Sequence, residues 1–248
     1  MSLNVLILSA GIGSRFKSKS KKPKSLIKIL DTTLIERLIE ILIKLGNKNF
    51  FITVGYQKNK IINKLKKYEK KINIKYIHIN DYRKVGSSYS FYQYIKFWKK
   101  NKRDTLFIHS DLFCHENLIK DVFSSKHKNI IGSFKKKSKK KDKGWIIELD
   151  FKRQITKIEK KNYRKNDSFY EISCINKFSK SYLNRLFKYM QIYFKEISKK
   201  DTWEILIDKF IREKGMKFNT NKRKKSFWYN INTIKDYNQA LNYCKKNN

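Results

Sequence analysis

The sequence predicts an α/β fold with a Rossmann-like mixed, mostly parallel sheet flanked by helices, followed by a smaller β-rich and helical part. Over the first 111 residues, short apolar runs alternate with segments of helical period. This alternation is typical of βαβ units. The apolar runs are continuous, as in strands that are buried on both faces. Glycines and polar residues follow them, at the carboxyl ends where such sheets bind ligands.

The predicted elements of the first part follow one another regularly. The apolar run over 5–8 is a strand that ends at a turn with two glycines. A helix over 34–45 has a broad apolar stripe, with Thr32 or Thr33 as its N-cap and Gly46 at its end. The other elements are a strand over 50–54, a polar helix over 57–71, a strand over 74–79, an aromatic helix over 89–99 and a buried strand over 105–109.

The chain changes in character after residue 111. We predict a solvated hairpin loop for the run KKKSKKKDK, 135–143, because runs of charge are mostly solvated. No linker stands out, so we predict one domain over 1–248. The elements of this part are a helix over 116–124, strands over 129–134, 145–149, 154–158 and 169–175 with a turn at 150–153, helices over 179–197 and 202–214, a strand pair of 216–219 with 227–231, and a helix over 233–245.

The net charge of +39 allows two interpretations. It fits a nucleic-acid or anionic-membrane partner. It also fits a general bias of the chain toward lysine, asparagine and isoleucine. The lysines are spread over the whole sequence, which favours the second interpretation, and we expect no specific nucleic-acid partner. In either case the field attracts polyanionic substrates such as a nucleoside triphosphate.

The cysteines give information about the compartment. Cys114, Cys174 and Cys244 are odd in number and none is paired at CxxC spacing. We therefore expect neither a disulfide framework nor a structural zinc site. The first apolar run is too short for a signal peptide and no stretch is long enough to span a membrane. These observations predict a cytoplasmic protein without membrane insertion, and they assign no oligomeric state.

The stretch NVLILSAGIGSRFKSKSKKPKSL, 4–26, carries the strongest chemical signal. It is not a dinucleotide fingerprint, because Phe16 stands at the third glycine position, and it lacks the G-K-[ST] of a P-loop. What remains is a glycine turn whose backbone N–H groups can bind an anion. Arg15 adds a planar fork suited to phosphate, and Lys24 adds a compact charge after Pro23, which stiffens the loop. Together they predict a triphosphate site outside the sheet.

These residues resemble the signature of the sugar-phosphate nucleotidylyltransferase superfamily, with L-S-A-G-I-G-S-R followed by P-K. Other segments continue the likeness in order, and the N-D-Y segment with the serines that follow it is similar to the phosphocholine cytidylyltransferase branch. The resemblance implies a nucleotide-binding part over about 1–134 and an acceptor-binding part over about 135–248. The implied nucleotide-binding residues are Leu8, Ser9, Ala10, Gly11, Gly13, Ser14, Arg15, Lys24, Gly55, Tyr56, Asn80, Ser87, Ser88 and Ser90.

The resemblance further implies Mg²⁺-dependent transfer of a nucleotide, with CTP preferred, to a small phosphorylated or phosphonate acceptor such as phosphocholine. Lys24 and Arg15 would neutralise the triphosphate, and Asp111 would hold the metal, since Mg²⁺ prefers oxygen ligands. The alternative role for Asp111 is a turn residue or the N-cap of the helix over 116–124. Asn232 stands where the family has a second metal carboxylate, and Ser110 replaces a glycine. An amide is a weaker ligand than a carboxylate, which leaves three alternatives: Asn232 ligates weakly, Glu204 or another acid takes its place, or the site uses only one protein carboxylate.

Three residues are candidates for acceptor binding, namely Trp203, Glu204 and Tyr229. An aromatic wall suits a quaternary ammonium, although such rings also serve as core. Two other functions stay open at this point. One is a sugar-1-phosphate nucleotidyltransferase. The other, from a different class, is a basic nucleic-acid-binding protein without catalytic activity, which would lose affinity steeply as salt rises.

Overall fold

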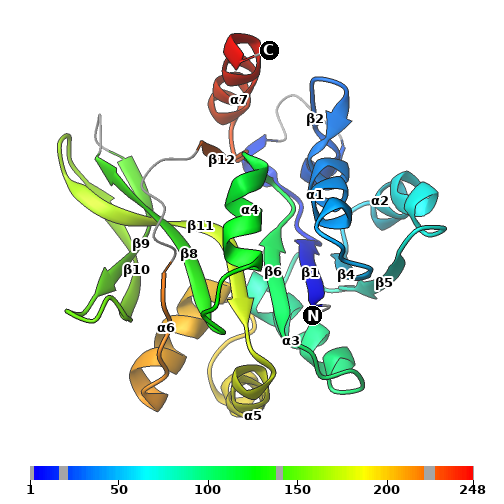
Figure 1. The fold of residues 1–248 in the computed structure, drawn as a ribbon. Coiled ribbons are helices and arrows are strands. Elements are labelled where there is room, and N and C mark those ends of the chain that lie inside the picture. The colour runs from blue at the N-terminus through cyan, green and yellow to red at the C-terminus, as the bar shows by residue number, and fades with distance from the viewer. Residues whose placement is uncertain (1–2, 17–21, 138–141, 221–226, 248) are drawn as a thin grey trace.

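The computed structural model describes residues 3–16, 22–137, 142–220 and 227–247. Its centre is a sheet that runs through the middle of Figure 1 in the strand order β10-β9-β11-β6-β1-β4-β5, with β8 paired to β11. Neighbours within β6-β1-β4-β5 are parallel, and the other pairings are antiparallel. The strands are β1 (Asn4–Ser9), β4 (Asn49–Val54), β5 (Asn73–His78), β6 (Thr105–His109), β8 (Ile130–Lys137), β9 (Asp142–Leu149), β10 (Ile155–Tyr163) and β11 (Ser168–Phe178).

Helices cover both faces of this sheet (Figure 1). Along β1, Val5 and Ile7 belong to the core cluster on one face, whereas Leu6 belongs to the cluster on the other. This alternation explains the continuous apolar run, because both faces of the strand are buried. The first face carries α1 (Leu34–Lys44), α2 (Lys58–Leu65) and α4 (Glu116–Phe123), and the second carries α3 (Ser87–Trp98), α5 (Lys180–Glu196) and α6 (Trp203–Lys214). The predicted α/β fold is confirmed.

Local sequence signals fix the ends of α1. Thr33 is the N-cap, and it exchanges hydrogen bonds with Glu36 in a capping box. Gly46 follows the helix with φ +82°, a left-handed conformation that favours glycine. Short 3₁₀ turns, which the apolar pattern does not reveal, occur at η1 (Ser14–Phe16), η2 (Lys24–Leu26) and η3 (Lys66–Tyr68).

The β-rich part joins the same sheet. β9 and β10 form the predicted hairpin, and the Asp150 carboxylate accepts a hydrogen bond from the backbone N–H of Gln154 in its turn. The predicted hairpin between β8 and β9 is wrong, because β11 lies between these two strands and pairs with both. Residues 138–141 of the lysine-rich run lie outside the described residues. Along one edge, β11 pairs first with β9 and then with β6. The backbone is irregular between the two pairings, with φ +61° at Cys174.

The C-terminal segment returns to the carboxyl ends of the parallel strands (Figure 1). There β12 (Trp228–Asn230) pairs with β7 (Leu112–Cys114), directly after β6, and α7 (Ile234–Asn247) follows. The predicted pairing of 216–219 with 227–231 is therefore wrong. Asn219 instead bridges to Ile130 and Gln154. A two-stranded ribbon of β2 (Lys28–Ile29) and β3 (Thr32–Thr33) completes the described strands. Within the described residues, no helix is both long and apolar enough to cross a membrane.

Candidate active site

A cavity of about 310 Å³ opens where β1 and β6 end. It lies at the carboxyl edge of the parallel strands, the position where open α/β sheets bind ligands. Its walls come from the glycine turn after β1, the 3₁₀ turn η2, the segment before α3 with the first turn of that helix, the end of β6, and Asn232, two residues before α7. The lining residues are Leu8, Ser9, Ala10, Gly11, Gly13, Ser14, Lys24, Ser25, Tyr82, Val85, Gly86, Ser87, Ser90, His109, Ser110, Asp111 and Asn232.

The glycine turn follows β1 directly and is held by hydrogen bonds to the neighbouring segments. The backbone N–H of Ser9 donates a hydrogen bond to Thr53 Oγ1, and the Ser9 hydroxyl contacts the Ser25 hydroxyl at 2.8 Å. Gly13 has φ +66°, and a Cβ added there would lie 3.1 Å from the Lys24 Cβ. This position therefore needs glycine both for its conformation and for the close approach of the Lys24 side chain.

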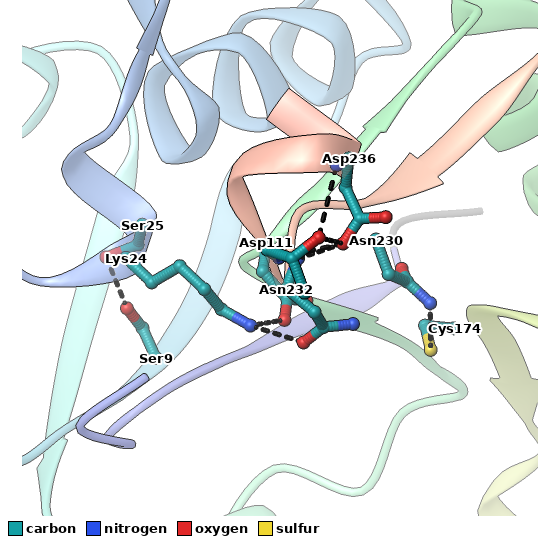
Figure 2. A network of polar contacts seen from close by, with 9 residues as sticks. Ser9, Lys24, Ser25, Asp111, Cys174, Asn230, Asn232 and Asp236 are labelled. Atoms are coloured by element: carbon teal, nitrogen blue, oxygen red, sulfur yellow. Dashed lines mark hydrogen bonds and ion pairs between the residues drawn. The ribbon is translucent and has the colours of Figure 1, made fainter. Parts of the chain in front are cut away.

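Lys24, Asp111 and Asn232 meet at one side of the cavity (Figure 2). The Lys24 ammonium forms an ion pair with the Asp111 carboxylate and donates a hydrogen bond to Asn232 Oδ1 at 2.8 Å. The Lys24 and Asp111 side chains are only 17% and 15% exposed. Lys24 thus directly contacts two residues that are far from it in the sequence. Only the family resemblance had linked the three.

Each of the three is positioned by a different local structure. Lys24 begins the 3₁₀ turn η2, which Pro23 precedes. Asp111 follows the buried strand β6, and its carbonyl accepts a hydrogen bond from the backbone N–H of Ile231. Asn232 is held by the start of α7, where Asp236 Oδ2 accepts its backbone N–H at 3.0 Å. The Asp236 carboxylate is therefore engaged in capping the helix, and the N-cap of α4 is His115 rather than Asp111.

Burial and neighbouring charges set the protonation states around Asp111. Burial alone would raise its pKa, but the charge of the Lys24 ammonium opposes this, so the pKa lies below its usual value. The pKa of His109 is lowered because burial disfavours the imidazolium. Asp111 is accordingly a carboxylate, and His109 is a neutral imidazole that lines the cavity.

Another wall is formed by the first turn of α3 and the segment that leads into it. Ser87 and Ser90 line the cavity there, whereas Ser88 does not. The Ser87 hydroxyl accepts a hydrogen bond from the backbone N–H of Trp203 at 2.9 Å, and the Ser88 hydroxyl donates to the carbonyl of Asp201 at 2.7 Å. Two of the serines implied by the resemblance thus join this wall to the segment before α6.

Gly55, Tyr56 and Asn80 lie beside the main cavity but do not line it. The backbone N–H of Tyr56 donates to the carbonyl of Ala10, and a Cβ on Gly55 would lie 2.7 Å from that oxygen. These two residues support the glycine turn from behind. Gly55 and Asn80 line a second cavity of about 410 Å³, which shares Tyr82 with the first.

The three candidate acceptor residues are placed differently from one another. Trp203 is fully buried, with its ring centroid 6.0 Å from that of His109. Glu204 is also buried, and burial raises its pKa to about 7, with Asp111 contributing in the same direction. Tyr229 lies in β12, opposite Phe113 of β7. In this structure none of the three lines the main cavity.

The predicted site residues leave out several residues that line the cavity, namely Ser25, Tyr82, Val85, Gly86, His109 and Ser110. His109 and Ser110 directly precede the predicted residue Asp111, and this adjacency was the sequence signal that could have identified them. The side chain of Arg15 lies outside the described part of the structure, so its contact with phosphate stays a prediction.

The donor set suits a hard divalent cation. Asp111 offers a carboxylate and Asn232 an amide oxygen, and a cationic group, the Lys24 ammonium, already contacts both. Mg²⁺ is typically held by one or two carboxylates together with water and substrate phosphates. The described residues contain no cluster of three or more histidine, cysteine or acidic side chains that could hold a metal ion.

The chain is similar to known proteins over most of its length. Residues 4–247 match the model of the family described as nucleotidyl transferase. The chain belongs to this family. A choline-phosphate cytidylyltransferase of Haemophilus influenzae is 30% identical to this nucleotidyltransferase over 159 residues, which are 63% of this chain and 62% of that protein. The aligned part is thus less than two thirds of the relative's length.

Solved structures show the same fold over almost the whole nucleotidyltransferase chain. The CTP:phosphocholine cytidylyltransferase from Streptococcus pneumoniae has a TM-score of 0.79 at 17% identity, covering 98% of this chain and 100% of that one. A putative glucose-1-phosphate thymidylyltransferase from Bacillus anthracis has a TM-score of 0.76 at 15% identity, covering 98% and 95%. The predicted nucleotidyltransferase superfamily is confirmed.

Proposed function

We propose that this nucleotidyltransferase is a Mg²⁺-dependent cytidylyltransferase that joins CTP to a small phosphorylated or phosphonate acceptor and releases pyrophosphate. The observation that carries the proposal is the convergence of Lys24, Asp111 and Asn232 at one cavity beside the glycine turn. The preference for CTP and for a phosphocholine-like acceptor is supported by the likeness to a choline-phosphate cytidylyltransferase in sequence and to a CTP:phosphocholine cytidylyltransferase in fold.

In the proposed reaction, an oxygen of the acceptor phosphate forms a bond to the α-phosphorus of CTP. The bond from that phosphorus to the oxygen bridging to the β-phosphorus breaks, and pyrophosphate leaves. This chemistry depends on positioning and charge neutralisation, so it requires no covalent intermediate on the protein. Backbone N–H groups of the glycine turn bind phosphate oxygens, and the Lys24 ammonium neutralises their charge. Asp111 and Asn232 would hold Mg²⁺, which would further neutralise the charge of the phosphate oxygens.

The acceptor is proposed to approach from the side of α6. Glu204 lies in the first turn of this helix and is buried, and the charge of Asp111 contributes to raising its pKa. A carboxyl group there favours an acceptor that carries a cationic amine at the end opposite its phosphate. Tyr229, which is half-buried, is the proposed aromatic contact of that amine, whereas the buried ring of Trp203 packs against His109 of the cavity wall. The free thiols of the three buried cysteines support a cytoplasmic location.

One observation favours a second candidate function. The thymidylyltransferase structure covers 98% of this chain with a TM-score close to that of the cytidylyltransferase. A sugar 1-phosphate would then be the acceptor, with UTP or deoxythymidine triphosphate as the donor.

A screen of pyrophosphate release separates the two functions. The four ribonucleoside triphosphates and deoxythymidine triphosphate are tested with Mg²⁺ against phosphocholine, phosphoethanolamine, 2-aminoethylphosphonate and several sugar 1-phosphates. We expect release with CTP and a phospho-amine or phosphonate. Release with UTP or deoxythymidine triphosphate and a sugar 1-phosphate would favour the second function, and release with no pair would contradict both.

A further inference from the structure

The position of the Lys24 ammonium has a consequence for the metal site. The nitrogen of Lys24 contacts Asp111 Oδ2 and lies 2.8 Å from Asn232 Oδ1, so it contacts both side chains that the proposed function assigns to Mg²⁺ (Figure 2). Metal–oxygen distances for Mg²⁺ are about 2.0–2.1 Å. An ion bound to both oxygens would therefore occupy the place that the ammonium fills here, and the two cations exclude each other.

The glycine turn offers the Lys24 ammonium a second position, away from these oxygens. Its stem runs along Gly13 of the glycine turn, where an added Cβ would lie 3.1 Å from the Lys24 Cβ and 3.5 Å from its Cδ. The ammonium is a compact charge on a flexible four-carbon stem. It can leave Asp111 and contact a phosphate bound to the same turn without movement of the backbone.

We propose that Lys24 acts as a competitor of the metal, so that it makes metal binding depend on the triphosphate. Without nucleotide, the ammonium holds Asp111 and Asn232, and a divalent ion binds weakly. With nucleotide, the phosphates attract the ammonium, and both oxygens become available to the ion. Such coupling is reciprocal, so the metal also promotes nucleotide binding. This inference rests on the proposed function, because it assumes that both ligands use this cavity.

The competition makes an unusual prediction for Lys24→Met. Removing a positive charge should tighten the binding of Mn²⁺ alone, measured by electron paramagnetic resonance without nucleotide. We expect at least about tenfold tighter binding than in the wild type, since hydrogen bonds to charged groups are the stronger class in proteins. The same variant should bind the complex of Mn²⁺ with the α,β-methylene analogue of CTP more weakly, because it lacks the phosphate contact. The two effects have opposite signs.

Two further variants make the test specific. Lys28→Met removes an exposed lysine of β2 that does not line the cavity, so it changes the net charge by the same amount as Lys24→Met. It should bind Mn²⁺ as the wild type does. Lys24→Met combined with Asp111→Asn should lose the gained affinity. Circular dichroism checks folding, and Lys24→Gln, which keeps a hydrogen-bond donor, replaces Lys24→Met if the latter is unfolded.

The outcomes separate this inference from the proposed function. If Lys24→Met binds Mn²⁺ no more tightly than the wild type, or if Lys28→Met gains as much, the competition is refuted while the proposed function stands. If wild-type protein fails to bind the complex of Mn²⁺ with the CTP analogue, the proposed function is refuted as well.

Discussion

Lys24 is the residue on which most of the site depends. Its ammonium contacts Asp111 and Asn232, and its stem lies along the glycine turn. We expect Lys24→Ala to reduce turnover by ~10²–10³, as is typical when a charge that stabilises a transition state is removed. The measurement is kcat from pyrophosphate release at saturating CTP, acceptor and Mg²⁺, with Lys28→Ala as the control. Near wild-type turnover in a folded Lys24→Ala protein would remove Lys24 from the mechanism.

Glu204 gives a prediction about pH. Burial raises its pKa from the ordinary value of 4.5 to about 7, so the folded state holds a proton that the unfolded state has released. The wild type therefore loses stability as pH rises from the unfolded pKa through the folded one. Glu204→Gln lacks this loss. The free energy of unfolding of the variant, relative to the wild type, should rise by about 3 kcal/mol between acidic and alkaline pH.

Urea unfolding of both proteins on either side of this pH window measures that difference. Parallel pH dependence in the two proteins would show that Glu204 ionises normally in the folded state.

Individual site residues differ in how well the sequence predicts their contacts. Lys24, Asp111 and Asn232 were predicted from motif order, and the structure brings them together. Ser87 and Ser88 were predicted to bind nucleotide, but their hydroxyl groups bond the backbone of a distant segment. A motif shows that a polar residue stands at a position, but it does not show which neighbour the side chain faces, because that neighbour comes from another part of the chain.

At the scale of elements, the start of α3 is docked against the connection between α5 and α6. The backbone N–H of Gly86 donates to the carbonyl of Lys199 at 2.7 Å, and Ser88 bonds Asp201. A Cβ on Gly86 would lie 2.0 Å from the carbonyl oxygen of Asp201. This wall of the cavity therefore keeps its position only if residue 86 has no side chain.

Gly86→Ala should move that wall. We expect a loss of roughly 1–3 kcal/mol in stability, the usual cost of overpacking, and a higher KM for CTP with a smaller change in kcat. Thermal melting and steady-state kinetics measure the two effects. Gly11→Ala is the control for stability, because an added Cβ there meets nothing within 4 Å. An unchanged KM in Gly86→Ala would show that the docking supports only the fold.

The elements differ in how well local sequence predicts them. The strands and helices of the first 111 residues follow from apolar periodicity and caps such as Thr33, because each signal lies within the element itself. The partner of β12 does not follow in this way. Its pairing with β7 joins residues more than a hundred positions apart, and both strands have only three residues.

The whole molecule has a net charge of +39, which should act on its substrates through long-range attraction. We expect kcat/KM for CTP to fall as salt rises, mainly through KM, because screening shortens the range of the field to about 10 Å at 0.1 M salt. Steady-state kinetics over a series of potassium chloride concentrations measures this. A kcat/KM that does not change with salt would show that the net charge plays no part in substrate capture.

The central claim is that Asp111 and Asn232, beside Lys24, form the metal site of a nucleotidyltransferase. Its most direct test is the Mg²⁺ dependence of pyrophosphate release in the wild type, Asp111→Asn and Asn232→Asp. Asp111→Asn keeps the size of the side chain but removes the charge, so turnover should be lost. Asn232→Asp adds a second carboxylate and should lower the Mg²⁺ concentration needed for half-maximal turnover. Full activity in Asp111→Asn, or an unchanged Mg²⁺ dependence in Asn232→Asp, would contradict the claim.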